Sequence, residues 1–191
     1  MGFPEFVVVI ASIMALNPLA MDMMLPALPN IRSAFQIADA NRPQMVLSIF
    51  LVGFGVGQFV MGPLSDRFGR MRPLVVGAAV CVAASAATVF APSVEVLVGA
   101  RFAQGVAGAA GMVIGRAIIA DLATGKAAAR AFSLMMIVGG VAPVVAPVLG
   151  GALTDVIGWR GLLAIVMLLA AVMLVAVLLV VKESLSTSRR S

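Results

Sequence analysis

Long apolar runs separated by short polar stretches make up most of the chain. Six of these runs are long enough to cross a lipid bilayer, which takes about 20 residues of α-helix. Because backbone groups in lipid must hydrogen-bond within their own segment, each run is predicted to be a helix. The fold class predicted is therefore an all-α membrane protein with six transmembrane helices. The expected spans are Phe6–Leu25, Gln44–Met61, Pro73–Phe90, Val94–Ile119, Ala131–Leu153 and Trp159–Val181.

The composition agrees with this pattern and excludes several kinds of chemistry. Hydrophobic residues form 62% of the 191 residues, charged residues only 11%, and the mean hydropathy is +1.15. A soluble domain is about 45–50% apolar and about 25% charged. There is no His, and Cys81 is the single Cys, which removes His-based catalysis, internal disulfides and Cys or His metal clusters. We therefore expect no enzymatic activity, no metal and no cofactor; an ATP-binding GxxxxGK[ST] loop is also absent from the sequence.

The net charge of +5 comes from basic residues in the short connections between spans. Nucleic acid is not an expected partner, since a basic face with interleaved aromatic residues is missing. One side of the membrane would hold Arg67, Arg70, Arg72, Lys126, Arg130, Lys182, Arg189 and Arg190. The other side would hold Arg32, Arg42 and Arg160. Because cytoplasmic loops carry the excess of Lys and Arg, both termini are predicted to be cytoplasmic.

Small and polar residues recur at steps of three and four along three of the spans. Small residues on one face allow helix backbones to approach closely, so these stripes are predicted to be packing faces. Frequent glycine in membrane helices is the alternative explanation. The stripes are Ser48, Gly55, Gln58 and Gly62 in the second span, Arg101, Gln104, Gly105, Gly108, Gly111 and Gly115 in the fourth, and Gly139, Ala142, Ala146 and Gly150 in the fifth.

The connection GPLSDRFGRMRP, residues Gly62–Pro73, is predicted to be a tight cytoplasmic hairpin. Gly62 and Gly69 would supply backbone conformations that other residues avoid. Asp66 could cap a helix N-terminus and pair with Arg70 four residues later. A plain basic loop is the alternative.

The same connection, GPLSDRFGR, resembles the loop signature of the major facilitator superfamily. LVGARFAQGVAGAAG and APVVAPVLGG resemble its fourth-helix motif and the fifth-helix motif of its drug:proton antiporters. MDMMLPALPNI, GRAIIADL and GWR are similar to the bicyclomycin/chloramphenicol-resistance (Bcr/CflA) exporters of bacterial inner membranes. Three positions depart from the usual motifs: Ala142 and Ala146 replace glycines, and Met71 replaces a basic residue.

The resemblance covers only the first of the two six-helix halves of such exporters. It implies a single domain, residues 1–191, built from two inverted three-helix repeats at about 1–92 and 93–191. Its expected function is efflux of a small amphipathic drug coupled to inward proton flow. A second half on another chain, or a second copy of this chain, would complete the transporter. The alternative is a structural or truncated membrane protein that transports nothing.

Buried charges are the first candidates for the coupling site, because a charged side chain at the centre of a bilayer costs about 2.5–3.5 kcal/mol on insertion scales. Asp22 and Arg101 lie at comparable depth in spans that line the central cavity of the resembling fold. We expect them to be neighbours, with a proton or cation competing for Asp22 and Arg101 favouring its charged form. An interfacial Asp22 that simply contacts water is the alternative. Gln104 and Asn17 are expected to line the same cavity; the alternative is that these uncharged polar groups only form hydrogen bonds between helices.

The resemblance also implies a cytoplasmic gate and an exporter motif. The gate would comprise Gly62, Asp66, Arg67, Gly69, Arg70 and Asp121, with two carboxylates around the Arg70 guanidinium. The exporter motif would comprise Pro143, Pro147, Gly150 and Gly151, with the prolines bending the helix. Arg116, at the inner boundary of the fourth span, is interpreted as a side chain that reaches the interface rather than as a site residue.

Overall fold

The computed structural model describes residues 3–39 and 41–181, and its side chains from residue 7 onward. The described part is entirely helical apart from short connections. Its elements are α1 (Phe3–Asp22), η1 (Leu25–Ala27), α2 (Leu28–Ala34), η2 (Arg42–Gln44), α3 (Met45–Phe68), α4 (Met71–Val89), α5 (Val94–Leu122) and α6 (Gly125–Val180). Lys182, Arg189 and Arg190, which contribute to the predicted orientation, lie outside the described residues.

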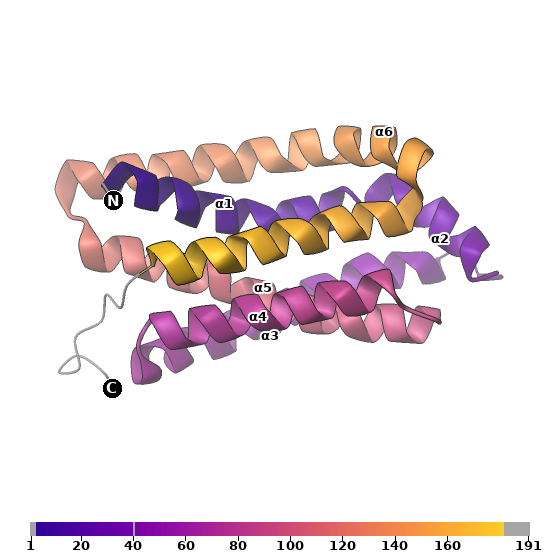
Figure 1. Ribbon diagram of the computed structural model, residues 1–191, viewed down its shortest axis with the longest axis horizontal. Helices are drawn as coiled ribbons and strands as arrows, with labels where there is room; N and C mark the ends of the chain where they lie inside the picture. The colour runs from indigo at the N-terminus through magenta and orange to yellow at the C-terminus, as the bar shows by residue number, and fades with distance from the viewer. Residues whose placement is uncertain (1–2, 40, 182–191) are drawn as a thin grey trace.

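The long helices lie side by side along one common direction, and α1 begins at the end of the bundle where α6 finishes (Figure 1). Five helices of the described part are long and apolar enough to cross a membrane. Six separate spans were predicted, and the difference lies in α6, which joins the last two across 56 residues. Many apolar side chains face outward, including Phe59 at 85% and Leu179 at 79% exposure, as expected for a surface that contacts lipid.

Gly158 divides α6 into two antiparallel arms, residues 125–157 and 159–180, and the ribbon reverses direction there (Figure 1). Its φ of 70° and ψ of 173° belong to a region that only glycine adopts readily. Because a single residue makes the turn, helix continues directly on either side and no loop separates the arms. The sequence pattern predicted a break near this point but not its brevity.

The predicted hairpin Gly62–Pro73 is mostly helix, which corrects two expectations. The turn between α3 and α4 consists of Gly69 and Arg70, and only Gly69 has a positive φ, of 88°. Gly62 is helical and needs no special conformation. Asp66 lies in the last turn of α3, so it does not cap the N-terminus of α4. The apolar run ends at Met61, but the helix continues to Phe68. The run ends where the helix passes from lipid into water, so hydropathy marks the membrane boundary and not the end of the helix.

The glycines of α5 form the central seam of the bundle. A Cβ on Gly105 would overlap the carbonyl of Phe50 in α3, and one on Gly115 would approach the side chain of Ile10 in α1. The stripe predicted on the fourth span is therefore a packing face. On α3 the prediction was wrong, because Gly55 and Gly62 face open space. The α3 residues that pack against α5 are Gly53 and Gly57, on another face of the helix.

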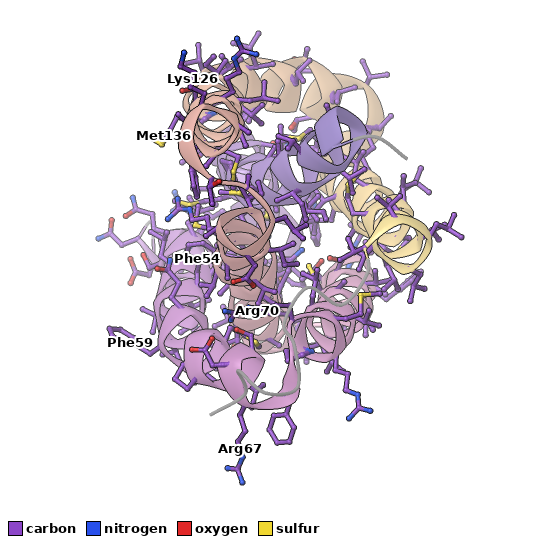
Figure 2. All side chains as sticks on the ribbon, turned by 90° about the vertical axis from the view of Figure 1, so that its left-hand side faces the viewer. Phe54, Phe59, Arg67, Arg70, Lys126 and Met136 are labelled. Atoms are coloured by element: carbon purple, nitrogen blue, oxygen red, sulfur yellow. The ribbon has the colours of Figure 1, made fainter. Side chains whose placement is uncertain are left out.

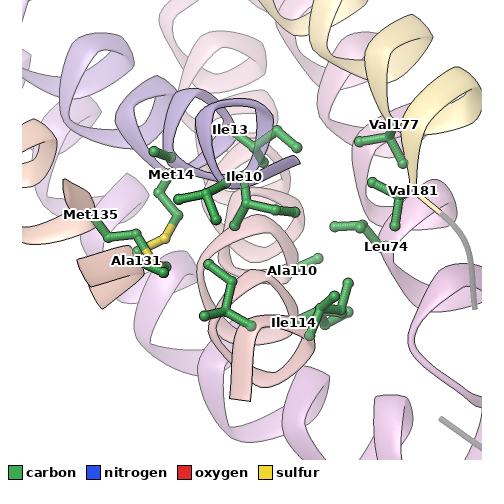
Figure 3. Packing of buried hydrophobic residues seen from close by; sticks show 14 residues of the cluster. Ile10, Ile13, Met14, Leu74, Ala110, Ile114, Ala131, Met135, Val177 and Val181 are labelled. Atoms are coloured by element: carbon green, nitrogen blue, oxygen red, sulfur yellow. The ribbon is translucent and has the colours of Figure 1, made fainter. Parts of the chain in front are cut away.

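The two larger apolar clusters of the described residues lie at opposite ends of the bundle. The first, shown in Figure 3, brings together Ile10 and Met14 of α1, Leu74 of α4, Ile114 of α5 and Val177 of α6. It lies at the end that carries Arg67, Arg70, Arg72, Lys126 and Arg130, which we call the basic end. The second lies at the far end, around Trp159, whose ring centroid is 5.5 Å from that of Phe35. Together the clusters hold helices from both halves of the sequence in one unit.

Candidate functional site

A cavity of about 760 Å³ opens between α1, α3, α5 and the first arm of α6. Most of its wall is apolar and deformable, with five methionines and three phenylalanines. These are Met14, Met21, Met112, Met135, Met136, Phe50, Phe54 and Phe132. Viewed from the basic end, Phe54 and Met136 lie on the same side of the bundle, on α3 and α6 (Figure 2). A volume of this size is typical of sites for drug-sized molecules.

Three polar side chains reach this cavity: Asn17, Asp22 and Arg116. Asp22 is the last residue of α1 and is half-buried. Asn17 is 8% exposed, and its Nδ2 donates to the carbonyl of Gly108 in α5 over 3.0 Å. A Cβ on Gly108 would overlap the Asn17 side-chain oxygen, so the glycine is what lets this amide enter the seam. Asn17 therefore lies in the cavity wall.

Arg101 and Gln104 do not line the cavity, contrary to the expectation for both. The Arg101 side chain is 0% exposed and lies between α1, α3 and its own helix α5, outside the cavity lining. Its Nη1 donates to Gln104 Oε1 over 2.7 Å, and its guanidinium carbon lies 4.8 Å from the centroid of the Phe50 ring. Among the described residues no ion pair joins Arg101 to Asp22.

The Arg101 guanidinium instead caps the end of α1. Its Nη2 donates to the carbonyl of Ala20 over 3.0 Å. The amide of Met24, the usual helical partner of that carbonyl, bonds to Met21 instead. The C-terminus of a helix carries partial negative charge, so α1 supplies the countercharge that no carboxylate provides in the described structure. Arg101 thus fixes the end of α1, two residues before Asp22.

Ser85 of α4 orients this buried group and was missed by the sequence analysis. Its Oγ donates to the carbonyl of Cys81 over 2.7 Å, which leaves the oxygen free to accept from Gln104 Nε2, also at 2.7 Å. That second bond turns Gln104 Oε1 toward Arg101. A lone serine within an apolar run carries no signal of such a contact, because the Gln104 partner is 19 residues away on another helix, α5.

A second polar cluster lies at the basic end, around Arg70. Its Nη1 donates to Asp66 over 2.5 Å and to Ser65 Oγ over 2.8 Å, and its Nε donates to Asp121 over 3.1 Å. The two carboxylates expected around one guanidinium are therefore together, and they join the α3–α4 turn to the end of α5. Ser65, which is fully buried, is an additional member of the cluster and belongs to the GPLSDRFGR segment.

The other predicted gate residues surround this cluster without joining it. Gly69 forms the turn that brings the Arg70 side chain within hydrogen-bonding distance of Asp66. Arg67 points away from the bundle while Arg70 points inward (Figure 2), and the Arg67 guanidinium carbon lies 5.5 Å from the centroid of the Phe68 ring. Gly62 contributes its carbonyl, which accepts from Ser65 Oγ over 2.9 Å.

The proposed exporter motif lies in the first arm of α6. Pro143 and Pro147 are inside continuous helix, while the sharp break of α6 is at Gly158. Gly150 packs directly on the Met23 backbone, where a Cβ would overlap the carbonyl oxygen. Gly151 lies near Pro26, 3.9 Å from the position of an added Cβ. The motif therefore packs α6 against the end of α1, next to Asp22. No cluster of three potential metal ligands occurs in the part of the chain that the structure describes.

Known proteins are similar to this chain in both sequence and architecture. The family described as Major Facilitator Superfamily matches residues 10–191. The chain is 37% identical over 177 residues to the uncharacterized MFS-type transporter YdgK of Bacillus subtilis, covering 92% of this chain and 44% of that protein. It is 33% identical over 161 residues to a chloramphenicol resistance protein of Pseudomonas aeruginosa, covering 81% and 38%. The structure of the human organic anion transporter MFSD10 (TETRAN) superposes with a TM-score of 0.74 at 21% identity, over 100% of this chain and 50% of that one. The chain thus spans about half the length of these proteins.

Proposed function

The chain belongs to the major facilitator superfamily, and from this premise we propose that it forms one half of a proton-coupled drug exporter of the Bcr/CflA type. The observation that carries the proposal is the cavity, a Met- and Phe-lined space that holds Asp22 on one wall. The likeness to a chloramphenicol resistance protein supports export of small amphipathic drugs. A second half, or a second copy of this chain, supplies the opposite wall.

In this proposal the chain crosses a bacterial inner membrane six times. Both arms of α6 exceed the length that a bilayer requires, and Gly158 forms the turn between the fifth and sixth spans. The repeats are about 1–92 and 93–191, and the basic end faces the cytoplasm with both termini. The arginines and the lysine at the basic end, against Arg32, Arg42 and Arg160 at the other, support this orientation.

Asp22 is the coupling residue in this proposal, and Arg101 is a positioning residue. In this proposal Asp22 takes up a proton from outside and loses it to the cytoplasm in each transport cycle. Arg101 acts through the α1 end that it caps, since the guanidinium lies outside the cavity. Asp66, Arg70 and Asp121 hold the basic end closed until the helices separate.

The test is chloramphenicol uptake by inside-out vesicles with an acidic interior. Vesicles containing the chain are expected to accumulate the drug only when the proton gradient is present. Asp22→Asn should abolish the gradient-dependent part, while Asp155→Asn, an exposed carboxylate of α6 that does not line the cavity, should leave it unchanged. If neither the chain alone nor two joined copies transport, the structural alternative replaces this proposal.

A further inference from the structure

Arg116 is the one basic side chain on the cavity wall in the described structure. It is exposed, lies six residues before the end of α5, and takes part in no ion pair among the described residues. The carboxylates nearest the basic end, Asp66 and Asp121, are already bound to Arg70. A guanidinium on an apolar cavity wall is therefore available to a ligand.

Asp22 is too distant to neutralise Arg116, although both line the same cavity. Gly115, adjacent to Arg116, packs on Ile10 of α1, and Asp22 lies twelve residues beyond Ile10. At a rise of 1.5 Å per residue, this separation is about 18 Å along the bundle. That is longer than the Debye length of about 10 Å in ordinary salt. The cavity thus has a cationic part near the basic end and an anionic part near the other.

The surroundings of Arg116 define what the cationic part can hold. Met112 lies one turn before it on α5, and Phe132, Met135 and Met136 line the same cavity from α6. Thioethers and aromatic rings pack well against flat aromatic groups. A guanidinium binds planar or tetrahedral oxyanions through two parallel hydrogen bonds. Together these side chains fit an aromatic molecule that carries one carboxylate or sulfonate.

We propose that Arg116 is a binding residue that selects amphipathic aromatic anions at the basic end of the cavity. The proposal rests on the proposed function, because it names the substrate class of that same cavity. It separates two roles within one space: Arg116 recognises the substrate, and Asp22 couples to protons some 18 Å away.

The test compares two probes of nearly equal shape, 2-naphthalenesulfonate and the neutral 2-naphthalenesulfonamide. Binding to the full chain in nanodiscs of zwitterionic lipid is measured by equilibrium dialysis, with empty nanodiscs as background. The chain should bind the sulfonate about ten-fold more tightly, the size expected for a charge-assisted hydrogen-bonded pair. Arg116→Gln should abolish that preference and leave sulfonamide binding unchanged, and Arg116→Lys should restore part of it.

The matched control is Arg130→Gln, which removes an exposed guanidinium at the same end of the bundle but outside the cavity. Its sulfonate preference should equal that of the original chain. Equal affinity for both probes, or a preference that survives Arg116→Gln, would overturn the anion proposal while leaving the cavity a binding site. Absence of binding by either probe would overturn this proposal, whereas the proposed function is decided separately by the chloramphenicol uptake of the vesicles. Loss of the preference in Arg130→Gln would assign it to general surface charge and also overturn the proposal.

Discussion

The Arg101 guanidinium holds the carbonyl oxygen of Ala20 at 3.0 Å, across 81 residues of sequence. This contact fastens the end of α1 to α5 and so sets the position of Asp22 in the cavity wall. It also places a full positive charge in the interior opposite a helix terminus rather than opposite a carboxylate. The stability of the bundle and the geometry of the candidate coupling residue therefore depend on the same bond.

Removing the guanidinium should be strongly destabilising. Arg101→Ala leaves the Ala20 carbonyl and Gln104 Oε1 without their donor and opens a void between α1, α3 and α5. Hydrogen bonds to a charged group contribute about 1.5–3 kcal/mol, so the free energy of unfolding should fall by at least that much. Unfolding in a titration with dodecyl sulfate measures the loss. Arg130→Ala, at an exposed position, should change the value by less than about 0.5 kcal/mol, and an equal loss in both variants would contradict the capping role.

The seam between α3 and α5 predicts opposite outcomes for two glycines of one helix. At Gly57 an added methyl group would overlap the backbone of Val106, so Gly57→Ala should destabilise the chain by about 1–3 kcal/mol. At Gly55 nothing lies within 4 Å, and Gly55→Ala should be neutral or slightly stabilising because alanine favours helix. The same unfolding titration compares the two. Equal effects would mean that the helices do not cross at this face.

Gly158 should not tolerate a side chain, although a Cβ there would meet no neighbouring atom. The obstacle is its backbone conformation, for which the strain is about 1–3 kcal/mol. Gly158→Ala should therefore lower the free energy of unfolding by that amount. Gly140→Ala provides the control, since Gly140 is helical and also faces open space. If Gly158→Ala were as stable as Gly140→Ala, the left-handed backbone conformation described for Gly158 would be contradicted.

The Arg70 cluster should contribute more than an ion pair on the surface. The Arg70 side chain is 11% exposed and that of Asp121 is 20% exposed, whereas Arg42 and Glu95, 3.3 Å apart, are 54% and 65% exposed. Asp121→Asn should cost about 1 kcal/mol, and the loss should persist at high salt because the pair is shielded from screening ions. Glu95→Gln should cost less than about 0.5 kcal/mol. Comparable losses that vanish in salt would mean that the cluster is an ordinary surface feature.

The sequence predicted the all-helical membrane architecture, the α5 packing stripe and the meeting of Asp66, Arg70 and Asp121 more closely than it predicted the number of separate helices and where they end. Hydropathy marks where a helix leaves the lipid and not where the helix ends. For this reason α3 continues to Phe68, past the predicted end at Met61, and α6 begins at Gly125, before the predicted start at Ala131. The position of Arg101 outside the cavity lining could not be inferred from its depth, because depth does not say toward which neighbour a side chain points. Ser85 and the Ala20 carbonyl gave no signal, since their roles depend on contacts with side chains of another helix.

The central claim, that the cavity is a water-filled route for substrate, is tested most directly by thiol labelling in proteoliposomes. Cys81 is the only cysteine in the chain, so a Cys81→Ala background allows single cysteines to be introduced. Met136→Cys, on the cavity wall, should react with a membrane-impermeant methanethiosulfonate reagent, and chloramphenicol should slow the reaction. Val80→Cys, exposed on α4 away from the cavity, should remain unreactive in lipid. If Met136→Cys were as inert as Val80→Cys, the cavity would be closed to water and the transport account would be contradicted.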